Sequence, residues 1–131
     1  FVTKSAKFIV DGVALAASGV TLEISNEVSD RNFVTSNGIG SKVVVGKSVT
    51  LNYTLDFVNT NELTKMKNNT KAAIFIELIN TAGDKVSIYL PVVSYSSVEL
   101  GNDGGVKTLS ISSMAYNDAE DNCLYIATTK A

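Results

Sequence analysis

An acidic cluster near the C-terminus is the part of this sequence whose residue types most suggest chemistry. Asp118, Glu120 and Asp121 are flanked by Asn117 and Asn122. Carboxylate and amide oxygens are the ligands that calcium prefers, but the segment lacks the sharp-turn glycine and the distal glutamate of a calcium-binding loop. A solvated hairpin is therefore a better interpretation than a metal site.

Other patterns have a chemical interpretation and a simpler one. Cys123 is the single cysteine and has no histidine or basic residue beside it, so we interpret it as a small buried apolar residue. The glycines at 38, 40, 104 and 105 lie in predicted turns, without the strand–loop–helix context of a phosphate-binding loop. Asn-X-Thr triplets occur at 52–54 and 68–70, but the first falls inside a predicted strand.

The composition excludes several classes of function. The chain has no histidine, the commonest general base and metal ligand, so we expect no enzyme, no cofactor and no metal. Arg31 is the only arginine, and the net charge is −2 with the charges scattered singly. Nucleic-acid binding needs clustered Lys and Arg to neutralise phosphates, so a specific DNA or RNA site is not expected.

The elements that position these residues are mostly strands. Segments 20–26 and 49–57 alternate strictly between apolar and polar residues, which predicts a sheet with one buried face and one solvated face. On the buried side of these and later strands we expect Leu22, Ile24, Leu51, Tyr53, Leu55, Ile74, Ile76 and Ile88. The solvated side carries Thr21, Glu23, Thr50, Asn52 and Thr54.

Turn and helix signals complete the predicted architecture. Asp11-Gly12 is typical of a two-residue hairpin, and Pro91 predicts an edge or a bulge in its strand. A short helix is expected at about 60–68, with Asn59 as N-cap and Glu62 three residues later as its capping partner. The 131 residues therefore predict one mainly β domain over 1–131, an antiparallel two-sheet sandwich or barrel with one flanking helix.

Residues 27–46 form a polar, glycine-punctuated stretch that we predict to be a loop too long for a simple connector. No stretch reaches the roughly 18 apolar residues of a membrane helix, so no membrane partner is expected. The chain begins at Phe1, directly within strand-like sequence. We therefore expect it to be a fragment, or to have lost preceding residues by cleavage.

The ordered series of motifs resembles the phage tail tube proteins, which share the tail tube fold with the tube proteins of type VI secretion and contractile injection systems. The likeness covers nearly the whole chain, and each motif alone is loose. In chain order the motifs are LEISN at 22–26, GKSVTLNYT at 46–54, DF at 56–57, the helix at 59–67, TKAAIFI at 70–76, LPVV at 90–93 and LSISSMAY at 109–116.

The resemblance implies a structural virion protein that assembles into six-fold or pseudo-six-fold rings. Stacked rings would form a hollow tail tube for the tape measure protein and then for DNA, which passes without specific binding. Self-association, the tape measure protein and other tail proteins are the implied partners. The implied location is the virion tail, with assembly in the host cytoplasm.

The resemblance also implies roles for two groups of residues. The long loop would stack one ring on the next, through Arg31, Phe33, Val34, Ile39 and Lys42. The polar side of the sheet would line the lumen or a joint between subunits. A start at Phe1 fits a trimmed subunit or one repeat of a tandem-domain protein, which leaves a hexamer and a tandem-domain trimer both open.

Two alternatives stay open at this stage. An Ig-like or adhesin-type binding module would share the strands, the low charge and the richness in Thr, Ser and Asn, although the chain has no Trp and a helix interrupts its strand rhythm. A tube protein of a bacterial contractile injection or type VI secretion apparatus would share the whole pattern.

Overall fold

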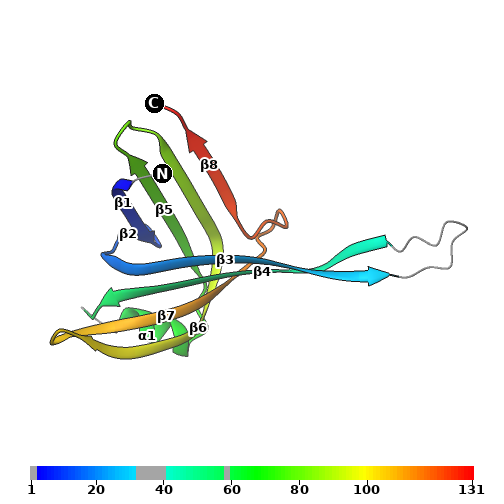
Figure 1. Cartoon of the computed structure of the whole chain (residues 1–131). Coiled ribbons are helices and arrows are strands. Elements are labelled where there is room, and N and C mark those ends of the chain that lie inside the picture. The colour runs from blue at the N-terminus through cyan, green and yellow to red at the C-terminus, as the bar shows by residue number, and fades with distance from the viewer. Residues whose placement is uncertain (1–2, 32–40, 58–59) are drawn as a thin grey trace, which may run out of the picture.

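The computed structural model describes residues 3–31, 41–57 and 60–131, with side chains described for the same residues except 3, 30–31 and 41–45. The described part contains eight strands and one helix (Figure 1). In order, they are β1 (Thr3–Val10), β2 (Val13–Ala14), β3 (Ala17–Arg31), β4 (Ser41–Asp56), α1 (Asn61–Lys67), β5 (Ala72–Asn80), β6 (Lys85–Asp103), β7 (Val106–Tyr116) and β8 (Tyr125–Thr129).

The strands form one antiparallel sheet in the order β2-β1-β5-β6-β7-β4-β3, with β8 added beside β6. The sheet bends over on itself, so that its two halves form two layers around the core (Figure 1). β6 belongs to both layers, because residues 85–93 pair with β5 and residues 92–103 pair with β7. The predicted mainly β, two-layered antiparallel fold is therefore confirmed, with the two layers joined into a single sheet.

Pro91 lies at the point where β6 changes partners. The strand pairs with β8 up to Tyr89 and with β7 from Val92 onward, and its register against β5 shifts between Ala72 and Ile74. Proline cannot donate a ladder hydrogen bond, so a break in the pairing is where it is tolerated. The bulge predicted at Pro91 is confirmed.

The Asp11-Gly12 hairpin is also confirmed. Both residues have a positive φ, 51° and 82°, as the favoured two-residue hairpin turn requires. The following Val13 pairs with Val10. The Asp11 carboxylate accepts a hydrogen bond of 2.9 Å from the Ala73 amide, which ties this turn to the start of β5.

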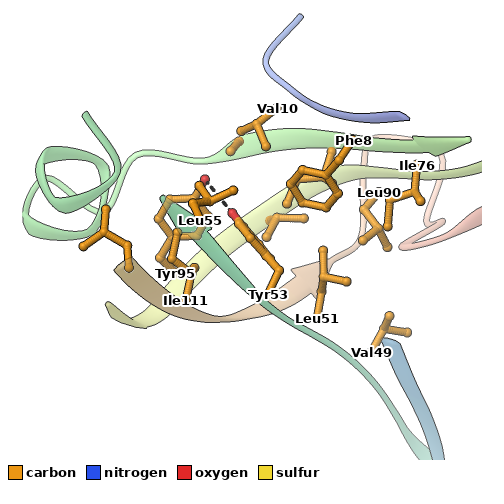
Figure 2. Packing of buried hydrophobic residues seen from close by; sticks show 14 of the residues in the cluster. Phe8, Val10, Val49, Leu51, Tyr53, Leu55, Ile76, Leu90, Tyr95 and Ile111 are labelled. Atoms are coloured by element: carbon orange, nitrogen blue, oxygen red, sulfur yellow. Dashed lines mark hydrogen bonds between the residues drawn. The ribbon is translucent and has the colours of Figure 1, made fainter. Parts of the chain in front are cut away.

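The core lies between the two layers, where β1 and β5 face β4 and β7 (Figure 2). The rings of Phe8 and Tyr53 meet across it, with centroids 4.7 Å apart. Most of the predicted core is confirmed, since five of its members are buried: Leu51, Tyr53, Leu55, Ile74 and Ile76. Cys123 is buried as well, in agreement with its interpretation as a small apolar residue.

The predicted burial of Ile24 is wrong, and that of Leu22 and Ile88 is only partial. Ile24 is 48% exposed although its partner across the ladder, Val49, is buried. β3 is the outermost strand of its layer, and Ile24 pairs with Val49, which lies just beyond the part of β4 that pairs with β7. The alternation of residue types places Ile24 on the apolar side, but it does not show how far the opposing layer extends.

The loop predicted at 27–46 is too long at both ends. The ladder between β3 and β4 continues through Glu27 and Gly46 to Arg31 and Ser41, so only residues 32–40 separate the strands. The register shifts between Glu27 and Val28, which explains why strict alternation stops although pairing continues. Because β7 pairs with β4 only from Thr50 onward, residues 23–31 and 41–49 form a two-stranded ribbon that projects from the sheet (Figure 1).

The helix spans Asn61–Lys67, within one residue of the expected bounds. Its N-cap is Thr60, which makes no capping hydrogen bond through its side chain, and the expected N-cap Asn59 lies outside the described residues. In the described part of the chain, no helix is long and apolar enough to cross a membrane.

Candidate assembly surfaces

The five residues predicted to form a polar side lie together on one face of the layer β3-β4-β7-β6. Thr21, Glu23 and Asn52 are exposed, while Thr50 and Thr54 are partly buried. The ladder extends this face onto β7 and β6, because Asn52 pairs with Ser112, which in turn pairs with Ser97. We call the set the polar face: Thr21, Glu23, Thr50, Asn52, Thr54, Ser97, Glu99, Ser110 and Ser112.

The polar face carries hydroxyl, amide and carboxylate groups and no basic side chain. The exposed Met114, the ladder partner of Thr50, adds one apolar side chain to it. Glu23 and Glu99 are its charged members, at opposite sides of the layer. Sequence reasoning missed the part on β6 and β7. The alternation of Leu109-Ser110-Ile111-Ser112 carries that signal, but only the register shows that these serines lie beside Thr54 and Asn52.

This layer has an edge on each side that no described strand covers. β3 pairs only with β4. On β6, residues 94–103 pair only with β7 among the described strands, because β5 ends its pairing at Val93. Unpaired N–H and C=O groups along such edges are templates for pairing with another chain.

The projecting ribbon contains the residues predicted to stack rings. Arg31 lies at the end of β3 opposite Ser41, and Lys42 lies opposite Asp30. Phe33, Val34 and Ile39 fall outside the described residues. Nearer the sheet, the ribbon exposes Val28 to solvent as well as Ile24.

A cavity of about 300 Å³ lies at the other end of the β3–β4 hairpin, and we call it the end cavity. It lies between the β1–β2 turn, the last residues of β4 and the first turns of α1. Its apolar wall is formed by Val10, Val13, Leu15, Ala16, Leu55 and Leu109. Asp11, Asp56, Asn61, Glu62 and Lys65 supply its polar lining.

A chain of polar contacts runs from the end cavity into the core. Lys65 Nζ lies 2.8 Å from Asp11 Oδ2 and 3.5 Å from Glu62 Oε1. The other oxygen of Glu62, Oε2, accepts a hydrogen bond of 2.5 Å from the hydroxyl of Tyr95. The Tyr53 hydroxyl donates in turn to that of Tyr95 over 3.2 Å (Figure 2). Every group in the chain thus has a partner.

These contacts change the predicted role of Glu62. It was expected to cap the helix, but its side chain is buried against Tyr95, and it anchors α1 to β6. An acidic residue in a first helical turn has the same sequence signature in both roles. Only the proximity of a tyrosine 33 positions away distinguishes them, and that proximity depends on the fold.

The electrostatics of this chain favour the ion pair between Asp11 and Lys65. Desolvation raises the pKa of Asp11, but the hydrogen bonds from Lys65 and the Ala73 amide outweigh it, so the net pKa is lowered. For Lys65, desolvation lowers the pKa, but the hydrogen bond to Asp11 and the nearby carboxylate of Glu62 outweigh it, so the net pKa is raised. Burial raises the pKa of the Tyr95 hydroxyl, which therefore stays protonated and donates to Glu62.

The acidic cluster near the C-terminus is a hydrogen-bonded turn. Asp118 Oδ1 accepts from the amides of Glu120 and Asn122, over 2.9 and 3.0 Å, and Oδ2 accepts from the Tyr125 hydroxyl over 2.7 Å. The bond from Tyr125 is the main reason why the pKa of Asp118 is lowered. In the described part of the chain, no group of three or more His, Cys, Asp and Glu side chains could hold a metal ion.

Comparison with known proteins adds a family and a fold. Residues 1–117 match the model of a family described as "Phage tail tube protein". Comparison with curated protein sequences gives no significant match.

Solved structures with a similar fold include chains from a tube-terminating cap and from a tail. A chain in a cryo-EM structure of the anti-feeding prophage cap, a tube-terminating cap, is 15% identical, with a TM-score of 0.68 over 95% of this chain and 88% of that one. Hcp1 from Flavobacterium johnsoniae is 10% identical, with a TM-score of 0.59 over 96% and 98% of the two chains. A chain from the tail of an empty GTA particle is also 10% identical, with a TM-score of 0.50 over 89% and 83%.

Proposed function

Because this chain belongs to the phage tail tube protein family, we propose that its copies join laterally into rings, and that stacked rings form the hollow tail tube through which DNA leaves the virion. The family establishes a structural protein of a tail or tube. The observation that carries the finer proposal is the layer β3-β4-β7-β6, which combines a polar face with two uncovered edges.

The two edges support lateral assembly. If the free edge of β3 in one copy meets residues 94–103 of β6 in the next, the layers join into a larger sheet. Such a contact is heterologous, since different surfaces meet, and it closes into a ring when the rotation between copies fits. Pairing would also cover edges that favour aggregation in an isolated monomer.

The polar face supports a lining role. When the layers close into a cylinder with the core of each subunit outward, the polar face becomes the inner wall. Its carboxylates repel phosphates, and it has no Lys or Arg to neutralise them, so DNA would slide along this wall without being held. The tape measure protein would occupy the same channel before DNA does.

The projecting ribbon supports stacking. Its base joins the core through the buried Val49, and the ribbon exposes Ile24 and Val28 to solvent. In the tube it would contact the adjacent ring, with Arg31, Phe33, Val34, Ile39 and Lys42 as stacking residues. Other tail proteins would bind at the two ends of the tube, in a tail assembled in the host cytoplasm.

Negative-stain electron microscopy of the purified protein at high concentration tests the proposal. We expect rings, or tubes with a central channel. A shortened variant separates ring formation from stacking. Replacing residues 33–40 by one glycine leaves Asn32-Gly, a two-residue turn, between the paired Arg31 and Ser41. This variant should fold and form rings that do not stack. Monodisperse monomers at all concentrations would contradict lateral assembly, and normal tubes from the shortened variant would contradict the stacking role.

A bacterial injection apparatus is the second candidate, and the similarity of the fold to Hcp1 and to the anti-feeding prophage cap favours it as a specific alternative. Both candidates require rings with a polar channel. They differ in what passes through the channel.

A further inference from the structure

The end cavity and the projecting ribbon lie at opposite ends of the same hairpin. The cavity includes Leu55 and Asp56, the last residues of β4, whereas the ribbon includes Ser41, the first residue of that strand (Figure 1). When identical rings stack head to tail, one end of each copy faces the opposite end of the next. Such stacking requires complementary surfaces at the two ends.

The cavity has the size and lining to receive one large apolar side chain. Its 300 Å³ lies at the lower end of the range of ligand pockets, ~300–1,000 Å³. Valine, leucine and alanine side chains form most of the wall, and Val13 at its rim is 61% exposed. The sequence between β3 and β4 supplies an aromatic candidate, Phe33.

Charge is complementary between the two ends. The cavity lining contains Asp11, Asp56, Glu62 and Lys65, three carboxylates and one ammonium, which give −3 + 1 = −2. Segment 31–42 contains Arg31 and Lys42 and no acidic residue, which gives +2, while Asp30 lies opposite Lys42 in the ladder and offsets that charge, so that Arg31 is the cation left for a neighbour. Asp11 and Glu62 already contact Lys65, whereas Asp56 is exposed and has no ion pair with any described residue. Asp56 is thus the carboxylate available to an incoming cation.

We propose that the end cavity is the receptor for the ribbon of a second copy in the adjacent ring, with Phe33 in the apolar pocket and Arg31 beside Asp56. This inference rests on the tube proposed above and adds the site that the ribbon binds. A rigid receptor fits the role, because the contacts of Lys65 and Glu62 hold α1 against the β1–β2 turn and β6.

Cysteine cross-linking in assembled tubes tests the contact directly. In a Cys123→Ala background, Val34→Cys combined with Ala16→Cys keeps Phe33 in place and should give disulfide-linked ladders of subunits under mild oxidation. Ala16 lines the cavity and is exposed, so the new thiol is accessible. The matched control combines Val34→Cys with Ser110→Cys, which is exposed on the polar face, and should give no ladder.

A charge exchange provides an independent readout. Arg31→Glu should raise the critical concentration for stacking by roughly tenfold or more, as expected for an interface arginine. Adding Asp56→Lys should restore stacking toward the original concentration. Tubes that form without the Ala16 cross-link, or a double variant no better than Arg31→Glu alone, would overturn the inference and leave the tube intact. A protein that forms neither rings nor tubes would overturn both.

Discussion

At the scale of single residues, the polar chain through Tyr53, Tyr95, Glu62, Lys65 and Asp11 decides how the helix is held. A buried carboxyl group is costly unless its oxygens have partners. Glu62 has one on each oxygen, the Tyr95 hydroxyl and the Lys65 ammonium group. The helix is therefore held by specific polar contacts as well as by apolar packing.

Tyr95→Phe should reduce the free energy of unfolding by about 1–3 kcal/mol, because it leaves a buried Glu62 oxygen without its donor. Chemical denaturation measures the loss. Tyr116→Phe is the matched control, since Tyr116 is 48% exposed and its ring stays available to the Lys71 ammonium group. Equal effects of the two substitutions would show that the Tyr95 hydroxyl does not stabilise the fold.

The ion pair of Asp11 should make stability depend on pH on the acidic side. The pKa of Asp11 is lowered in the folded state, so its contribution is fully present above the ordinary value of 3.8 and is lost as the pH falls through the folded-state pKa. Asp11→Asn keeps a residue that tolerates positive φ and should cost about 0.5–1 kcal/mol at pH 7, because the pair is partly exposed.

Urea unfolding of Asp11→Asn and of the unsubstituted protein at pH 7 and at pH 2.5 checks this pH dependence. The difference seen at pH 7 should become smaller at pH 2.5, and Asp103→Asn, at an exposed site, should show little difference at either pH. If the difference in unfolding free energy were as large in acid as at pH 7, the charge of the Asp11 carboxylate would not be its cause.

At the scale of elements, sequence patterns predicted what depends on neighbours along the chain. The alternation in β4, the Asp11-Gly12 turn and the break at Pro91 were predicted because each depends on side-chain period or backbone geometry. The exposure of Ile24, the anchoring role of Glu62 and the extension of the polar face onto Ser112 were not, because they depend on which strands lie opposite. The end cavity was missed for the same reason.

The two faces of β4 should differ sharply in their contribution to subunit stability. Leu51→Ala removes a side chain that is 1% exposed and should cost about 2–5 kcal/mol through the cavity that it leaves. Thr50→Ala, its neighbour on the polar face, should change stability by less than about 0.5 kcal/mol. Denaturant unfolding of the subunit measures both. Equal losses would mean that both faces are packed within one subunit, and the polar face would then be unavailable to line a channel.

At the scale of the whole molecule, the sign of charge on the polar face should control how the assembly treats DNA. Glu99→Lys introduces a cation on the proposed inner wall, so assembled tubes should retain DNA at low salt and release it as salt rises. Unsubstituted tubes should retain none. Co-sedimentation of tubes with short duplex DNA measures the retention.

The control for this experiment is Glu120→Lys, which makes the same charge change in the exposed turn after β7. If Glu120→Lys tubes retained as much DNA as Glu99→Lys tubes, the polar face would have no special role in DNA retention. Tubes that form normally but retain no more DNA with Glu99→Lys than without it would show that Glu99 does not line the channel.

The strand shared by the two layers has a mechanical consequence. A sandwich made of separate sheets can shear, since only side chains join its halves, but here the covalent backbone of β6 continues from one half into the other. Force applied to the inner wall by a passing polymer would be carried along this backbone into the outer half of the subunit. We therefore expect the two halves to resist extension together and to rupture in one event when a single subunit is pulled.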